Sequence, residues 1–251
     1  MLNVKWGKEK LWERLLRIER TIRVLYEALT KPLNKYATKI ITRLPFSCFF
    51  FRPLVLNELF MALGLWEPYV RRNLVLREGD VFIDIGAHIG YYTVYTSQKV
   101  GKDGLVIAIE PDRRNLKVLH KNVKTIRANN VLVYEVAAGF NGFLYLSPQE
   151  NPLLTKTTRK DAGGQNRIPS ISLDSLLDEI GKNTKFHSVI VKIDVEGGEL
   201  DIIKGGLLFL KNLSPTLIIE TENPSELEAT LKQFGYTCSK IFKNYFMFLT
   251  I

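Results

Sequence analysis

Short apolar runs alternate with amphipathic stretches along the chain from residue 81 onward. The apolar runs predict buried strands at 81–85, 105–109, 131–136, 188–193 and 216–220. The stretches between them predict helices near 90–99, 112–123, 174–180, 199–210 and 224–234. Because this alternation is typical of parallel strands covered by helices on both faces, it predicts a doubly wound α/β fold.

Two segments depart from this alternation. The polar segment 139–170 predicts a loop insertion with one short strand near 142–146. Tyr236–Phe242 and Tyr245–Ile251 predict two strands joined tightly around Asn244, which form an antiparallel C-terminal hairpin. The prediction is therefore a mostly parallel, Rossmann-like sheet of seven strands. Dinucleotide-binding sheets usually finish with parallel strands, so the hairpin favours the methyltransferase version of this architecture.

The N-terminal part of the chain has a different pattern. Leucines and isoleucines recur in alternating steps of four and three from Leu11 to Leu29, which predicts one amphipathic helix over 10–29. Pro32 ends that region, and residues 54–76 also look mostly helical. We therefore expect a helical N-terminal extension over 1–75 and a catalytic domain over 76–251.

The net charge of +9 is concentrated in the N-terminal segment. Residues 1–78 hold 15 Lys and Arg against 7 Asp and Glu, a net of +8, which leaves +1 for the rest. A basic segment of this kind can face phosphates, an anionic membrane surface or an acidic partner, or it can be a solvated surface. Nucleic acid and peripheral membrane contact both stay open as partners, and the oligomeric state is not predicted.

Cysteine usage and hydropathy indicate a cytoplasmic protein. The two cysteines, Cys48 and Cys238, form no CxxC pair, which is typical of a reducing compartment, with one long-range disulfide as the alternative. No apolar run reaches the roughly 18 residues of a membrane-spanning helix, and the basic N-terminus lacks an apolar signal core.

A glycine loop follows the first predicted strand of the α/β region. Asp84, Gly86 and Gly90 lie between this strand and the next helix, where open α/β sheets bind ligands. The spacing Gly-x-x-x-Gly does not fit the dinucleotide fingerprint. Glu110 closes the second strand, where a carboxylate can accept the hydroxyl protons of a ribose. His88 can touch a ligand or be held by local hydrogen bonds.

Acidic residues gather at the carboxyl ends of the predicted strands. They are Asp84, Glu110, Asp194, Glu196 and Glu220. Such a concentration of negative charge repels a pyrophosphate but suits a sulfonium cofactor that carries an ammonium group. The sequence therefore predicts S-adenosylmethionine as the cofactor, held by Asp84, Gly86, His88, Gly90 and Glu110.

A second group of polar residues closes the fourth strand. With a period of two, Lys192, Asp194 and Glu196 lie on one face of this strand. We predict Asp194 and Glu196 as catalytic residues, because a positioned carboxylate can assist deprotonation of an acceptor hydroxyl. In one alternative, Asp194 or Glu196 has no catalytic role and forms an ion pair with Lys192. In another, Asp194, Glu196 and Glu220 bind Mg²⁺ or Ca²⁺; our prediction includes no metal.

The chain resembles the FkbM family of methyltransferases over about residues 70–251. The resemblance rests on the segments Ile83–Thr93, Glu110-Pro111, Ile171–Leu177 and Lys192–Glu199. It implies a class I methyltransferase fold, S-adenosylmethionine as methyl donor and, usually, O-methylation of hydroxyls on sugars or secondary metabolites. It also implies cofactor binding by Asp84, Gly86, Gly90 and Glu110, and places Asp194 and Glu196 at the active-site crevice. His88 departs from the family pattern, which more often has Asn there.

The leading hypothesis is an O-methyltransferase that acts on a hydroxyl of a glycan or small metabolite. A second hypothesis is an RNA methyltransferase that uses the basic N-terminal segment to hold phosphates. A third is a non-catalytic nucleoside-binding or membrane-peripheral protein that docks through helix 10–29.

Overall fold

The computed structural model describes residues 40–44, 47–52, 55–147, 156–158, 167–182 and 186–250. The predicted helix 10–29 lies outside these residues. Internal contacts divide the chain into two compact units. Of the described residues, the smaller unit holds 40–44, 49–52 and 55–66, and the larger unit holds the rest. The larger unit thus includes the chain from Glu67 onward, whereas the sequence predicted that the catalytic domain begins at residue 76.

The smaller unit contains two paired strands and a helix. Strands β1 (Ile40–Leu44) and β2 (Ser47–Phe51) pair with each other, and helix α2 spans Leu56–Ala62. The prediction of a helical extension is therefore wrong for residues 40–44 and 47–51. Phe49 and Phe51, two positions apart, are both 3% exposed, so the apolar run has the period of a strand. The fully buried carboxylate of Glu58 is ion-paired with Arg52.

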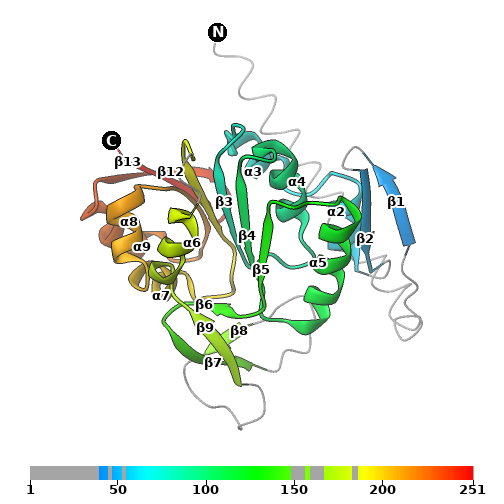
Figure 1. The fold of residues 1–251 in the computed structure, drawn as a ribbon. Helices are drawn as coiled ribbons and strands as arrows, with labels where there is room; N and C mark the ends of the chain where they lie inside the picture. The colour runs from blue at the N-terminus through cyan, green and yellow to red at the C-terminus, as the bar shows by residue number, and fades with distance from the viewer. Residues whose placement is uncertain are drawn as a thin grey trace, which may run out of the picture. The chain divides into compact units, whose positions relative to one another are not determined.

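The larger unit is built on one sheet of seven strands (Figure 1). Its order is β12 (Tyr236–Phe242), β13 (Tyr245–Thr250), β11 (Thr216–Glu220), β10 (Val189–Ile193), β3 (Val81–Ile85), β4 (Leu105–Ile109) and β5 (Val131–Tyr134). Neighbouring strands from β11 to β5 are parallel. Strand β13 is antiparallel to both β11 and β12. This confirms the predicted mostly parallel sheet with antiparallel C-terminal strands, the class I methyltransferase fold. Cys238, in β12, has a free thiol.

Helices cover both faces of this sheet (Figure 1). Odd-numbered strand residues such as Ile83 and Ile193 pack with Ile180, Ile203, Phe209 and Leu227 from one set of helices. That set comprises α6 (Leu177–Gly181), α7 (Glu199–Lys204), α8 (Leu207–Leu213) and α9 (Pro224–Lys232). On the other face, Ala108 packs against Leu119 of α5 (Arg113–Thr125). Two more helices belong to this unit, α3 (Pro68–Asn73) and α4 (Tyr91–Val100).

One predicted helix is divided in the structure. The sequence predicts a single helix over 199–210, but α7 ends at Lys204 and α8 begins at Leu207. At Gly205 a Cβ atom would lie 2.2 Å from the carbonyl oxygen of Gly139, and at Gly206 it would lie 2.8 Å from Cβ of Leu173. The two glycines therefore let the chain between the helices approach its neighbours closely.

The segment predicted as a loop forms part of a second sheet. Its strands are β6 (Ala137–Ala138), β7 (Gly142–Ser147), β8 (Lys156–Thr158) and β9 (Arg167–Ile171), in the order β6-β9-β7-β8. Gly142–Tyr145 pair antiparallel with Arg167–Ser170. The single short strand near 142–146 is thus present, but it has partners that the polar composition did not reveal.

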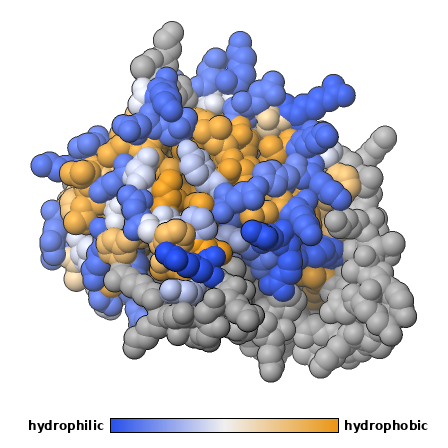
Figure 2. All heavy atoms as spheres, turned by 60° about the horizontal axis from the view of Figure 1, so that its bottom comes forward, coloured by the Kyte–Doolittle hydropathy of each residue, from blue (hydrophilic) through white to orange (hydrophobic). Residues whose placement is uncertain are grey.

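None of the helices in the described part of the chain is both long enough and apolar enough to cross a membrane. Large apolar side chains are nevertheless exposed on the larger unit, among them Phe140, Phe143, Leu207 and Leu208. Figure 2 shows a face on which apolar side chains gather inside a border of polar ones. Phe140 lies between β6 and β7, Phe143 lies in β7, and Leu207 and Leu208 begin α8, so none of them lies at the strand ends described next.

Candidate functional site

Asp84 lies inside β3, just before the glycine loop. Its side chain is 1% exposed, and Oδ2 accepts a hydrogen bond of 2.6 Å from Oγ1 of Thr93 in α4. Burial raises the pKa of Asp84 above its ordinary value. Among the described residues, the buried Oδ1 has no hydrogen-bond partner. A buried acceptor of this kind is satisfied when a ligand donates to it.

Gly86 and Gly90 turn the chain as the sequence predicted, since their φ angles are +79° and +86°. A Cβ atom on Gly86 would lie 2.0 Å from the carbonyl oxygen of Asp194, and one on Gly90 would lie 3.2 Å from Leu119. The backbone N–H of Asp194 also donates to the carbonyl oxygen of Ile85, at 3.0 Å. The close approach that Gly86 permits is therefore to the end of β10.

His88 has a left-handed backbone conformation, with φ of +52°. Its backbone N–H donates to Oε2 of Glu110 at 2.8 Å. Among residues other than glycine, Asn, Asp and His adopt this conformation most readily. The departure from the Asn of the family pattern therefore has a backbone explanation, while a contact between His88 and the cofactor stays a prediction.

Glu110 connects the glycine loop to the start of α5. Its side chain is 4% exposed, and Oε1 accepts from the backbone N–H of Asp112 at 2.8 Å and from Nδ2 of Asn115 at 3.3 Å. Burial raises the pKa of Glu110 to about 7, against the opposing effect of these donors. Oε2 has one protein donor, His88, so a lone pair remains for a ligand hydroxyl.

Lys192 and Asp194 form an ion pair at the end of β10. Nζ of Lys192 lies 2.5 Å from Oδ2 of Asp194 and 4.8 Å from the ring centre of Tyr92. Burial alone would lower the pKa of Lys192, but Asp194, Glu67 and Asp84 together raise it. Burial alone would raise the pKa of Asp194, but Lys192 outweighs it and holds the value below the ordinary one. Both groups are therefore charged at neutral pH.

Glu196 lies beyond the end of β10. Strand β10 ends at Ile193, so the period of two that placed Glu196 beside Asp194 does not continue beyond the strand. The side chain of Glu196 is exposed. Its predicted place at the crevice and its catalytic role stay predictions.

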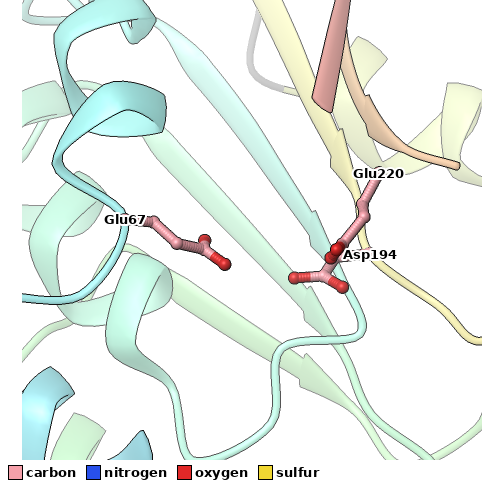
Figure 3. Close-up of side chains that lie close together, drawn as sticks. All are labelled: Glu67, Asp194 and Glu220. Atoms are coloured by element: carbon pink, nitrogen blue, oxygen red, sulfur yellow. The ribbon is translucent and has the colours of Figure 1, made fainter. Parts of the chain in front are cut away.

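The structure instead brings two other acidic residues to Asp194 (Figure 3). One carboxylate oxygen from each of Glu67, Asp194 and Glu220 lies within 4.8 Å of the others. We call these three residues the carboxyl cluster. Glu220 ends β11, as the sequence indicated, whereas Glu67 immediately precedes α3. The carboxylates of Glu67 and Asp194 point toward each other.

The hydroxyl of Tyr245 lies at the centre of the carboxyl cluster. It is 2.6 Å from Oε1 of Glu67, 2.7 Å from Oε2 of Glu220 and 3.2 Å from Oδ2 of Asp194. Tyr92, in α4, donates its hydroxyl to Oε2 of Glu67 at 2.9 Å. The sequence analysis did not predict Glu67, Tyr92 or Tyr245 as site residues. Tyr245 begins β13 and pairs with Glu220 of β11, but this pairing is visible only in the structure.

The carboxyl cluster holds at least one proton at neutral pH. A phenol has one proton to donate, so three carboxylates cannot all accept from Tyr245. Burial, followed by the charge of Asp194, raises the pKa of Glu220 to about 9. Burial raises the pKa of Glu67 to about 7, although Lys192 lowers it. Tyr245 and Lys192 thus serve the cluster as protein partners, and we assign no metal to it.

A protein-family model matches most of the larger unit. Residues 84–238 match the family model of the methyltransferase FkbM domain. The match includes the glycine loop, Glu110 and the end of β10. Glu67 and Tyr245 lie outside it.

Three curated proteins are similar over part of the chain. A probable decarboxylating cobalt-precorrin-6B C(15)-methyltransferase of Sulfurisphaera tokodaii is 30% identical over 168 residues, which are 59% of this chain and 83% of that protein. Protein-L-isoaspartate O-methyltransferase 1 of Archaeoglobus fulgidus is 32% identical over 47% of this chain and 53% of its own length. The hexuronic acid methyltransferase AglP of Haloferax volcanii is 30% identical over 51% of this chain and 50% of its own length. The chain thus spans about half the length of the last two.

Solved structures with a similar course of the chain include an FkbM methyltransferase and a protein that binds S-adenosylmethionine. The methyltransferase FkbM of Methylobacillus flagellatus has a TM-score of 0.49 and 22% identity, over 72% of this chain and 46% of that one. TYW2 of M. jannaschii, solved with S-adenosylmethionine, has a TM-score of 0.45 and 17% identity, over 86% of this chain and 88% of that one.

Proposed function

The chain belongs to the FkbM family of S-adenosylmethionine-dependent methyltransferases, and we propose that it methylates a hydroxyl oxygen of a glycan or small metabolite. When bound, the cofactor supplies an electrophilic methyl group on a sulfonium. Its ammonium and ribose hydroxyls are hydrogen-bond donors, and the structure offers acceptors for them in Oδ1 of Asp84 and Oε2 of Glu110. We propose the loop from Asp84 to Gly90, together with Glu110, as the cofactor site.

The carboxyl cluster is the observation that carries the choice of acceptor. It lies at the carboxyl ends of β10 and β11, and Gly86 brings the glycine loop into contact with the end of β10. A carboxylate acceptor would have to enter beside the ionised Asp194, which repels it. A hydroxyl is neutral, and it gains a hydrogen-bond acceptor and a destination for its proton. The geometry therefore favours a hydroxyl over a carboxylate.

The similarity to AglP supports a sugar as the carrier of this hydroxyl, because AglP is a hexuronic acid methyltransferase. We propose Asp194 and Glu196 as crevice residues, with Asp194 kept ionised by Lys192 so that it attracts the cationic cofactor. The absence of a CxxC pair supports a reducing compartment, and we propose that the reaction takes place in the cytoplasm.

A methyl-transfer assay tests this proposal. The purified chain is incubated with S-adenosylmethionine carrying a radioactive methyl group and with p-nitrophenyl β-D-glucuronide or p-nitrophenyl β-D-glucoside. We expect label in at least one sugar as an alkali-stable methyl ether, because the hydroxyl oxygen is the acceptor. Alkali-labile label on the glucuronide alone would show a methyl ester and overturn the choice of a hydroxyl. Label only in total RNA, added in a parallel reaction, would favour the RNA hypothesis.

A further inference from the structure

Glu67 reaches the active site from outside the residues that match the family. It precedes α3 with a left-handed backbone, φ +39°, and Pro68 follows as the first residue of that helix. The left-handed conformation costs a residue other than glycine about 1 kcal/mol or more, and such strain is concentrated at functional sites. The side chain is only 9% exposed, and its carboxylate points toward Asp194 (Figure 3).

Two buried tyrosines, from α4 and β13, hold this carboxylate. Tyr92 donates to Oε2 and Tyr245 contacts Oε1, so each oxygen has one protein partner. Both tyrosine side chains are at most 4% exposed. A carboxylate oxygen can accept two hydrogen bonds, so one position on each oxygen remains for a substrate.

The other two acids of the carboxyl cluster are less suited to accept a proton. Asp194 is ion-paired with Lys192, and protonation would leave that buried ammonium without its counter-charge. Glu220 already carries a proton at neutral pH, because its pKa is about 9. This leaves Glu67 as the member that can change its protonation state near neutrality.

The surroundings of Glu67 support this assignment. The charged and titratable groups that face it are Tyr91 and Tyr92 of α4, Lys192 and Asp194 at the end of β10, Glu220 of β11 and Tyr245 of β13. Burial raises the pKa of Glu67 to about 7, while Lys192 and the two tyrosines lower it and Asp194 raises it. A general base is most effective when its pKa lies near the working pH.

We propose that Glu67 is the general base of the reaction, a role that rests on the proposed function. The proton of the acceptor hydroxyl passes to the Glu67 carboxylate as the hydroxyl oxygen forms its bond to the methyl carbon. The bond from sulfur to that carbon breaks, and its electron pair stays on sulfur. The sulfonium thus loses its positive charge as the carboxylate loses its negative charge, so the net charge of the site does not change. Tyr92 and Tyr245 are positioning residues that hold Glu67.

A first experiment needs no acceptor. Carboxyl resonances are recorded between about pH 5 and 9 on the protein with ¹³C-labelled glutamate and bound S-adenosylhomocysteine. The Glu67 signal is identified by its loss in Glu67→Gln. We expect it to titrate near pH 7. Titration below about pH 5, or a group that stays protonated beyond about pH 8.5, would overturn the proposal, because neither could serve as a base near neutrality.

A second experiment uses the sugar acceptor that the wild-type chain methylates. We expect Glu67→Gln to lower kcat by about 10²- to 10⁴-fold, with binding of S-adenosylhomocysteine changed by less than about threefold. Glu179→Gln is the matched control, since Glu179 of α6 pairs with Lys182 beside the amino ends of β4 and β5, at the opposite edge of the sheet. Wild-type kcat in folded Glu67→Gln would overturn the role of Glu67. If the wild-type chain methylates no hydroxyl, the proposed function itself fails, whatever the ¹³C titration shows.

Tyr92→Phe tests the same role without changing Glu67. The Tyr92 hydroxyl stabilises the ionised carboxylate, so its removal raises the pKa of Glu67. A base works only when deprotonated, and the acidic limb of kcat against pH should therefore move to higher pH. An unmoved limb in this variant would contradict the assignment.

Discussion

Gly86 is the residue at which the glycine loop contacts the end of β10. A Cβ atom there would lie 2.0 Å from the carbonyl oxygen of Asp194, closer than real Cβ atoms come to other atoms. That oxygen belongs to the backbone, so it cannot move aside as a flexible side chain can. The absence of a side chain at Gly86 thus sets the distance between the two halves of the site.

Substitution of Gly86 by alanine should cost more than backbone strain alone. Gly235 has the same φ, +79°, but a Cβ atom on it would meet nothing within 4 Å, so Gly235→Ala isolates the strain. We expect Gly235→Ala to lower the free energy of unfolding by about 1 kcal/mol and Gly86→Ala by at least about 2 kcal/mol more. Urea denaturation measures both. Equal losses would show that the contact with Asp194 relaxes freely.

The sequence predicted those site residues whose position follows from a strand end. Asp84, Gly86, Glu110 and Asp194 each stand at or just after a buried apolar run, and parallel strands bring such ends to one edge of the sheet. Glu67 and Tyr245 were not predictable in this way. They are 178 positions apart in the chain and meet only through tertiary structure, so neither belongs to a local pattern.

At the level of elements, Asp174 connects the segment after β9 to helix α8. Its Oδ1 accepts from the backbone N–H of Phe209 at 2.8 Å, in the first turn of α8, and its own backbone N–H donates to the carbonyl oxygen of Gly205. The first N–H groups of a helix have no partner within it. Asp174 therefore caps a helix that is distant in sequence. This gives a structural role to Ser172-Leu173-Asp174, part of the segment Ile171–Leu177 on which the family resemblance rests.

Asp174→Ala should remove this cap and leave the other elements intact. We expect a loss of about 1 kcal/mol in the free energy of unfolding, as for other side-chain caps. Asp174→Asn retains an oxygen acceptor and should lower the free energy of unfolding by only a few tenths of a kcal/mol. Chemical denaturation of the two variants and the wild type checks the difference. Equal destabilisation by both variants would indicate that the negative charge, rather than the hydrogen bond, matters.

Elements with a strong apolar period were predicted more accurately than elements whose bounds depend on tertiary contacts. Strands β3, β4 and β11 have the predicted bounds because fully buried parallel strands read as continuous apolar runs. The second sheet was missed because its strands are short and separated by polar segments. The break between α7 and α8 depends on the close approach of Gly139 to Gly205, which the apolar period of 199–210 does not reveal.

For the molecule as a whole, buried acids should make stability depend on pH. Burial raises the pKa of Glu67 and Glu110 to about 7 and that of Glu220 to about 9, whereas an unfolded glutamate titrates near 4.3. Between these values the folded state binds more protons than the unfolded state, so stability falls as pH rises. Asp194, whose pKa is lowered, has the opposite effect, mainly below about pH 4. Lys192, whose pKa is raised, has the same effect as these glutamates, mainly above about pH 10.

We therefore expect Tm to be higher at pH 6 than at pH 9, and to fall most between about pH 5 and 7, where all three glutamates contribute. Glu110→Gln should flatten that part of the curve, because it removes one of them. Differential scanning calorimetry across the range measures both effects. A Tm that rises toward pH 9 would contradict the raised pKa values.

The insertion of β13 between β11 and β12 has a consequence for the newly made protein. A ribosome produces Glu67, Asp194 and Glu220 well before Tyr245. During that interval their carboxyl groups lack the hydroxyl that joins them, because β13 has not yet entered the sheet. The carboxyl cluster is completed only when this strand is added. We therefore expect it to be the last part of the candidate site to form.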